Sequence, residues 1–232
     1  MERKYSLLTA MFILIALIST SGFYFSYFAK LASLGDFFFV THLHLFLFFC
    51  WFAMLIVQPI LVRRRKPELH RKIGRLSYFL APLIVVSILV LVFNAIPRNY
   101  ANSPEQAAIT AVGGILDVIS FSICYVIAMV KKRDLRWHVA FIIGASLIVL
   151  NPGLGRLVSN LVNNDAGILA MVVTPFLFAF TILCYEKFKL KRPMLKSPYL
   201  AFAFVWICEL ALFIVLPQTA FWKELIASMA KT

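Results

Sequence analysis

The stretch from Phe37 to Val62, FFFVTHLHLFLFFCWFAMLIVQPILV, most constrains what this chain can fold into. About 20 consecutive apolar residues are enough for a helix to cross the hydrocarbon core of a bilayer, and this stretch is longer. It is followed directly by four basic residues, Arg63 to Lys66. Basic residues beside a span are enriched on the cytoplasmic side of a membrane. The segment therefore predicts a transmembrane helix whose C-terminal end faces the cytoplasm.

Apolar stretches of similar length recur along the chain. They predict seven transmembrane helices, over residues 6–28, 37–62, 74–96, 107–130, 137–162, 167–186 and 198–216. With 62% hydrophobic residues, the chain has too little polar surface for a soluble globule. We therefore expect an all-α polytopic membrane protein in which residues 1–232 form a single seven-helix bundle. Apolar side chains at helical spacing within 218–232 predict a further helix on the membrane interface.

Local signals refine the ends of these helices. Pro67 is suited to the first turn of a helix, so we expect the third helix to begin there, before the membrane. Ser103 predicts the N-cap of the fourth helix, and Pro97 predicts the end of the third. Residues 151–156, NPGLGR, predict an interruption of the fifth helix, because proline and glycine both disfavour a helix interior.

The basic residues are divided unequally between the two sides of the predicted bundle. If the N-terminus is cytoplasmic, 18 of the 23 Lys and Arg residues lie in cytoplasmic segments. This asymmetry predicts a cytoplasmic N-terminus and an external C-terminus, the reverse of the orientation of G-protein-coupled receptors. The same loops account for the net charge of +13, so we expect no nucleic-acid partner. The predicted partners are the bilayer and its anionic lipids.

Polar residues of several spans are predicted to meet in the outer half of the bundle. His44, Asp117 and Glu209 lie within apolar spans, where an ionisable side chain is costly unless it faces other polar groups. Asn151 and Arg156 lie at a similar depth on the fifth span. We expect these five residues to form a pocket that is open to the outside and binds a ligand. The alternatives are a structural salt bridge between Arg156 and an acid, and a histidine hydrogen-bonded between helices.

A second candidate site lies at the cytoplasmic ends of the third and fifth helices, where His70 and His138 occur. Two imidazoles brought together between helices would suit haem iron or another transition metal. The same region carries basic residues that suit the head groups of anionic lipids: Arg71, Lys72, Arg75 and Arg136. In the alternative interpretation, both histidines belong to a lipid-binding surface that holds no metal.

Three segments carry a resemblance to a known family: THLHLFLFF, LVRRRKPELHRKIGRLSY and RWHVAFIIGASLIVLNPGLGRL. They resemble an uncharacterised family of bacterial polytopic membrane proteins, which has a histidine in an early span, an LHRxxGR loop and a later histidine that opens a span. The resemblance covers about residues 37–160. The matching positions are His42 or His44, His70, Arg71, Gly74, Arg75 and His138.

This resemblance implies a shared fold but no activity, and we expect the inner membrane of a bacterium as the location. A looser similarity is to dihaem cytochromes of the b561 type, which are also helical and ligate haem through histidine. Those cytochromes have four histidines paired at two depths inside the bundle, an arrangement that this chain does not have.

Three functions remain open from the sequence. The first is a redox or metal-dependent membrane protein that uses His70 and His138. The second is a transporter or ligand-binding protein that uses the outer polar pocket. The third is an assembly or lipid-organising factor without chemistry, in which the polar residues only lock the helices together. The chain has no phosphate loop and no HExxH motif, so nucleotide or zinc-protease chemistry has no support.

Overall fold

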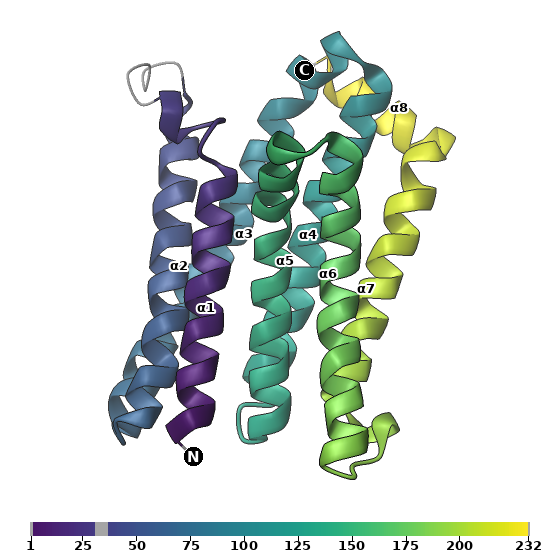
Figure 1. The fold of residues 1–232 in the computed structure, drawn as a ribbon. Helices are drawn as coiled ribbons and strands as arrows, with labels where there is room; N and C mark the ends of the chain where they lie inside the picture. Colours follow the sequence, from purple (N-terminus) through teal and green to yellow (C-terminus); the bar gives the residue numbers. More distant parts are fainter. Residues whose placement is uncertain (1, 31–36, 232) are drawn as a thin grey trace.

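A computed structural model describes residues 2–30 and 37–231 of the chain. These residues form a bundle of long antiparallel helices (Figure 1). The helices are α1 (Glu2–Gly22), α2 (Phe39–Arg63), α3 (Pro67–Asn102), α4 (Pro104–Val130), α5 (Leu135–Leu161), α6 (Asn164–Cys184), α7 (Pro198–Val215) and the short α8 (Ala220–Met229). Seven of the helices in the described part of the chain are long and apolar enough to cross a membrane, which confirms the predicted all-α architecture with seven spans.

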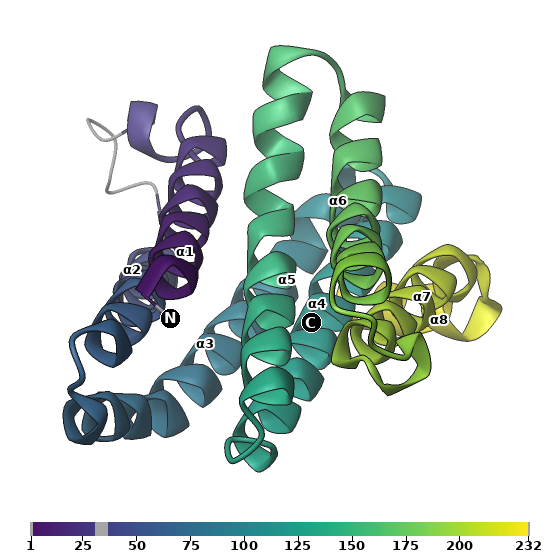
Figure 2. The same cartoon turned by 60° about the horizontal axis from the view of Figure 1, so that its bottom comes forward.

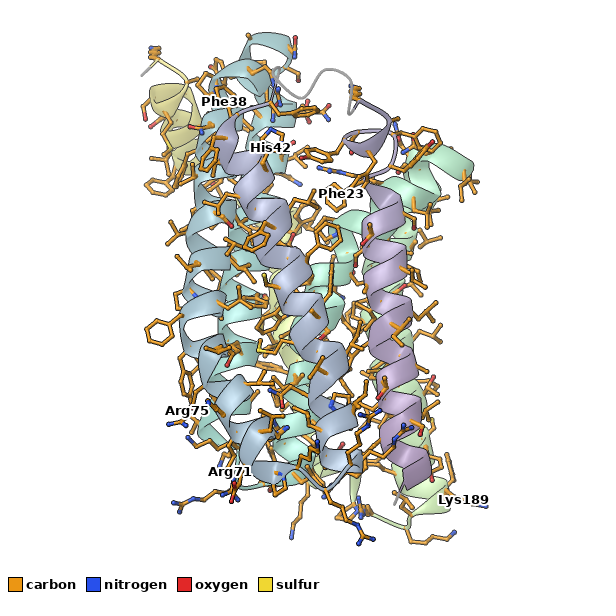
Figure 3. All side chains as sticks on the ribbon, turned by 90° about the vertical axis from the view of Figure 1, so that its left-hand side faces the viewer. Phe23, Phe38, His42, Arg71, Arg75 and Lys189 are labelled. Carbon is orange, nitrogen blue, oxygen red and sulfur yellow. The ribbon has the colours of Figure 1, made fainter. Side chains whose placement is uncertain are left out.

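The two ends of the bundle differ in charge. The connections α2–α3, α4–α5 and α6–α7 lie at the end where α1 begins (Figure 1). Together with the start of α1 and the adjoining ends of α2, α3 and α5, these segments hold 18 of the 23 Lys and Arg residues of the chain. We call this the basic end, and the end that carries α8 the opposite end. Figure 3 shows Arg71, Arg75 and Lys189 at the basic end and Phe23, Phe38 and His42 at the opposite end.

Several helix ends follow the local sequence signals. Pro67 lies in the first turn of α3, where its missing N–H is not needed by the helix. The Ser103 hydroxyl accepts a hydrogen bond from the backbone N–H of Gln106 at 3.2 Å, so it caps α4 as predicted. The predicted end of the third helix at Pro97 is wrong, because α3 continues through this proline to Asn102. Its C-terminal turns extend beyond the length that an apolar span needs.

The predicted interruption of the fifth helix is also wrong. α5 is helical from Leu135 to Leu161, with Pro152 inside it. The glycines of this segment serve close packing instead. A Cβ atom on Gly153 would lie 2.5 Å from the Cα atom of Ser19, and one on Gly155 would overlap the side chain of Met171. The NPGLGR segment therefore lets α1 and α6 approach α5 more closely than larger residues would allow.

The core of the bundle contains a cluster of aromatic side chains between α2 and α4. The Trp51 ring meets Phe121 and Tyr125 edge-on, at centroid distances of 5.3 and 6.0 Å. Trp51 and Phe121 are almost completely buried. On the outer surface, large apolar side chains such as Phe79 and Phe204 are exposed. An apolar exterior around an apolar core is expected of a helix bundle that faces lipid rather than water.

The predicted helix near the C-terminus is present as α8, which packs against α3 and α4 at the opposite end (Figure 1). The Trp222 indole N–H donates a hydrogen bond to the Ala108 carbonyl at 2.9 Å, and Trp222 and Ile226 are buried. Phe221 remains 71% exposed. Part of the apolar face of α8 therefore covers the protein itself, and the rest is free to contact lipid.

We predict that Gly153→Ala destabilises the protein by about 1–3 kcal/mol, because the added methyl group meets the backbone of α1 and the two helices must separate. The measurement is the thermal unfolding midpoint in detergent. The matched control is Gly74→Ala, whose Cβ would meet only the Gln58 side chain, at 3.4 Å. Equal stability of the Gly153 variant and the wild type would contradict the close contact of α1 with α5.

Candidate functional site at the basic end

A cavity of about 790 Å³ lies at the basic end between α1, α2, α3, α4 and α5. Figure 2 brings this end of the bundle forward and shows the helices between which the cavity lies. Its walls are largely apolar and include Phe12, Leu55 and Ile142. The cavity is within the size range of sites that bind drug-sized ligands, about 300–1,000 Å³.

His70 of α3 and His138 of α5 both line this cavity, so the structure brings these two histidines together. The Nδ1 atom of His138 is 2.9 Å from the backbone carbonyl oxygen of Ala128. A carbonyl can only accept, so Nδ1 carries the hydrogen and Nε2 of the neutral ring is left as an acceptor. The Nδ1 atom of His70 is buried and has no hydrogen-bond partner within the described ranges.

Two further polar atoms in the cavity wall are buried without a partner in the described part of the chain. They are the indole N–H of Trp51 and Oε1 of Gln58. An unsatisfied buried polar atom costs about 1–3 kcal/mol, so such atoms are uncommon unless water or a ligand meets them. Ser77 and Tyr125, which also line the cavity, are hydrogen-bonded to each other at 2.8 Å. The unpaired atoms therefore point to a bound molecule or to water.

The mouth of the cavity is strongly basic. Its lining includes Arg71, Arg75, Lys132 and Arg133, and no Asp or Glu. Lys132 is held near Tyr78, with its amine 3.2 Å from the phenol oxygen. Figure 3 shows Arg71 and Arg75 where α3 reaches the basic end. An unopposed group of cations of this kind creates a positive potential that attracts anions.

The four predicted lipid-binding residues have different surroundings. Arg71 and Arg75 line the cavity, and Lys72 is exposed without lining it. Arg136 instead forms an ion pair with Glu186, with Nη2 2.7 Å from Oε1. Glu186 is 5% exposed and also accepts a hydrogen bond from the Ser197 hydroxyl at 2.6 Å. Arg136 therefore joins α5 to the α6–α7 connection.

At the opposite end, His42 and His44 have separate partners. The Nδ1 atom of His42 is hydrogen-bonded to the Tyr27 hydroxyl. The Nδ1 atom of His44 is 2.9 Å from the Ser87 hydroxyl, which connects α2 to α3. This is the arrangement of a histidine hydrogen-bonded between helices, one of the two alternatives left open by the sequence.

Four of the five residues of the predicted outer pocket fall into two groups. Arg156 lies over the Phe23 ring, 4.5 Å from its centroid, and close enough to His44 to interact electrostatically. Asp117 and Glu209 lie within hydrogen-bonding reach of each other between α4 and α7. Within the described ranges, the ion pairs both involve Glu186, so Arg156 pairs with neither acid. Asn151 is buried on α5.

The sequence identified His70, Arg71, Arg75 and His138, and it missed other residues of the cavity, including Ser77, Tyr125, Lys132 and Arg133. Helical spacing could have found Ser77, because residues 70, 74 and 77 follow each other at intervals of four and three on one face of a helix. The same intervals relate residues 125, 129 and 132, which bring Tyr125 and Lys132 to one side of α4 and its C-terminal loop.

Comparisons with known proteins add no assignment. No family model, no curated protein and no solved structure matches this chain. Within residues 2–30 and 37–231, no group of three or more His, Cys, Asp or Glu side chains is placed to hold a metal ion. The cavity at the basic end is therefore the main candidate for a functional site.

We predict that Arg156→Gln and Glu209→Gln have additive effects on the free energy of unfolding, within about 0.5 kcal/mol, because the two side chains form no ion pair. Unfolding of the single and double variants in detergent measures this. The control cycle is Arg136→Gln with Glu186→Gln, whose side chains form an ion pair, and we expect a coupling of about 0.5–3 kcal/mol there. Strong coupling in the Arg156 cycle would restore the salt-bridge interpretation.

Proposed function

We propose that this chain is a multi-pass membrane protein that binds a small amphipathic anion in the cavity at the basic end. The observation that carries the proposal is the make-up of the cavity wall. It combines a largely apolar interior, four cationic side chains without an acid, and buried polar atoms without a partner in the described part of the chain. Each of these features matches one part of a ligand that has an apolar body and an anionic head group.

The cations would hold the head group. Arg71 and Arg75 lie one helical turn apart on α3, and guanidinium groups bind phosphate or carboxylate through paired hydrogen bonds. The apolar walls would take up the body of the ligand, at about 25 cal/mol for each Å² removed from water. Gln58 and His70 offer further hydrogen bonds inside the cavity.

The charge asymmetry supports a cytoplasmic position for the basic end, because Lys and Arg concentrate on that side of membrane proteins. The N-terminus would then be cytoplasmic and the C-terminus external, in the inner membrane of a bacterium. The cavity would be filled from the cytoplasm or from the inner leaflet, whose anionic lipids match its charge.

Haem is a second candidate ligand of the same chemical kind, because it has an apolar ring and anionic propionates. His138 supports it, since a ligating histidine usually donates its other ring nitrogen to a carbonyl or carboxylate, as Nδ1 of His138 does to Ala128. His70, which lines the same cavity, would be the second residue to hold the haem. A closed zinc site with four protein ligands has no support within the described residues.

The two remaining hypotheses have less support. A ligand pocket of five polar residues in the other half of the bundle is weakened by the division of these residues into two groups. An assembly factor without a ligand would leave the unpartnered polar atoms in the cavity wall to water alone.

We predict that the purified protein binds a fluorescent fatty acid about tenfold more tightly than its uncharged methyl ester, because hydrogen bonds to charged groups contribute about 1.5–3 kcal/mol. Replacing both arginines, Arg71→Gln with Arg75→Gln, removes this preference. The matched control is Arg64→Gln, which removes a charge at the same end from a residue that does not line the cavity. Binding is measured by fluorescence titration in detergent.

Equal affinity for acid and ester in the wild type would contradict an anion site. The absorption spectrum of the same preparation tests the haem alternative. A Soret band that is lost in both His70→Ala and His138→Ala would identify haem as the ligand, and a colourless protein that prefers the fatty acid would favour a lipid-like anion.

We predict that cysteines introduced at Lys131 and Lys187 are not labelled from outside in intact cells and become labelled once the membrane is permeabilised. The reason is that both residues lie in connections at the basic end. A membrane-impermeant maleimide measures the accessibility. Labelling of either cysteine in intact cells would reverse the proposed orientation.

A further inference from the structure

A pair of carboxyl groups lies inside the bundle, on the side of its midpoint that faces the opposite end. Asp117 of α4 and Glu209 of α7 lie close enough to each other to interact, and Ser120 lies beside the same Glu209 carboxyl group. Asp117 is partly buried. Glu209 is 8% exposed, and its Oε2 atom has no hydrogen-bond donor in the described part of the chain. The contact is therefore made between two groups that both accept hydrogen bonds when ionised.

α5 supplies a third polar residue to the same layer. In the middle of the bundle, the backbone of Gly144 faces Cys124 and Phe202. α4 runs antiparallel to α5 and α7 (Figure 1). Seven residues after Gly144 on α5, seven after Phe202 on α7 and seven before Cys124 on α4 therefore lie at the same level, nearer the opposite end. The residues at that level are Asn151, Asp117 and Glu209. Asn151 is 1% exposed and its Oδ1 atom also has no partner within the described ranges.

No cation balances this pair among the described residues. The ion pairs found there involve only Glu186, and Arg156 of α5 lies over Phe23. α3 has no titratable side chain between residues 79 and 97, and α5 has none between residues 139 and 155. Cys124 is the next titratable group on α4, while Cys208 of α7 is exposed and Lys223 and Glu224 belong to α8 at the opposite end.

Two adjacent carboxylates without a cation are unfavourable at such a site, because both charges lose water and each repels the other. A proton held between the carboxyl groups removes one charge. It also gives the unpaired Oε2 acceptor the donor that it lacks. We infer that Asp117 and Glu209 form a proton-binding site within the membrane-spanning part of the bundle, with Ser120 and Asn151 as neighbouring hydrogen-bonding groups. The site is separate from the cavity and does not depend on its ligand.

Infrared spectroscopy of the full chain in detergent tests this inference, because only a protonated carboxyl group has the C=O stretch of a carboxylic acid. At about pH 7, where exposed carboxyl groups with ordinary values near 4 are ionised, we expect this band in the wild type, with a shift in D₂O. Glu209→Gln and Asp117→Asn should each remove it. The matched control Glu224→Gln changes an exposed glutamate of α8 and should leave it unchanged.

The wild type alone gives a second readout, which does not require a variant to fold. The band should lose intensity as the pH is raised from neutral to alkaline values, while the backbone amide bands stay unchanged. Absence of the band at neutral pH, or its persistence in both Glu209→Gln and Asp117→Asn, overturns the inference. A band that appears only when Na⁺ is replaced by choline also overturns it, because Na⁺ would then occupy the site in place of the proton.

Discussion

The exclusion of water from the bilayer is the constraint on which the rest of this structure depends. Inside a membrane, backbone groups must be satisfied within each helix, and polar side chains must find partners within the bundle. The seven long helices meet the first requirement. Intramembrane polar residues meet the second through the backbone of their own helix, as Ser146 does with Ile142, or through contacts between neighbouring helices, such as His44 with Ser87 and Ser77 with Tyr125. The polar atoms that remain unpaired are informative for this reason, and several of them lie at the basic cavity.

The helices could be predicted from the sequence because their length and apolarity are properties of single segments. The starts of α3 at Pro67 and of α4 after Ser103 could also be predicted from the sequence, since helix capping depends on neighbouring residues. The conformation of the NPGLGR segment could not be predicted, because glycine is compatible both with a broken helix and with a close contact between intact helices. Only the position of Ser19 beside Gly153 distinguishes the two.

The candidate sites were harder to predict, because depth in the membrane can be counted along a helix but rotation about its axis cannot. Residues such as Arg156 and Asp117 lie at similar depths and yet face different helices. Amphipathic patterns usually reveal rotation, but helices that are apolar on all sides give little such signal. Part of the cavity lining could nevertheless be predicted, because His70, Arg71 and Arg75 lie close together in one segment at the end of a helix.

The close contact between Gly153 and Ser19 has a mechanical consequence for the cavity. The contact holds α1 against α5 near the opposite end. Tyr5 of α1 lines the cavity about 21 Å away along the same helix. A tilt of α1 about this contact would displace Tyr5 much further than Ser19. The packing at one glycine therefore helps to set the width of the cavity at the other end of the helix.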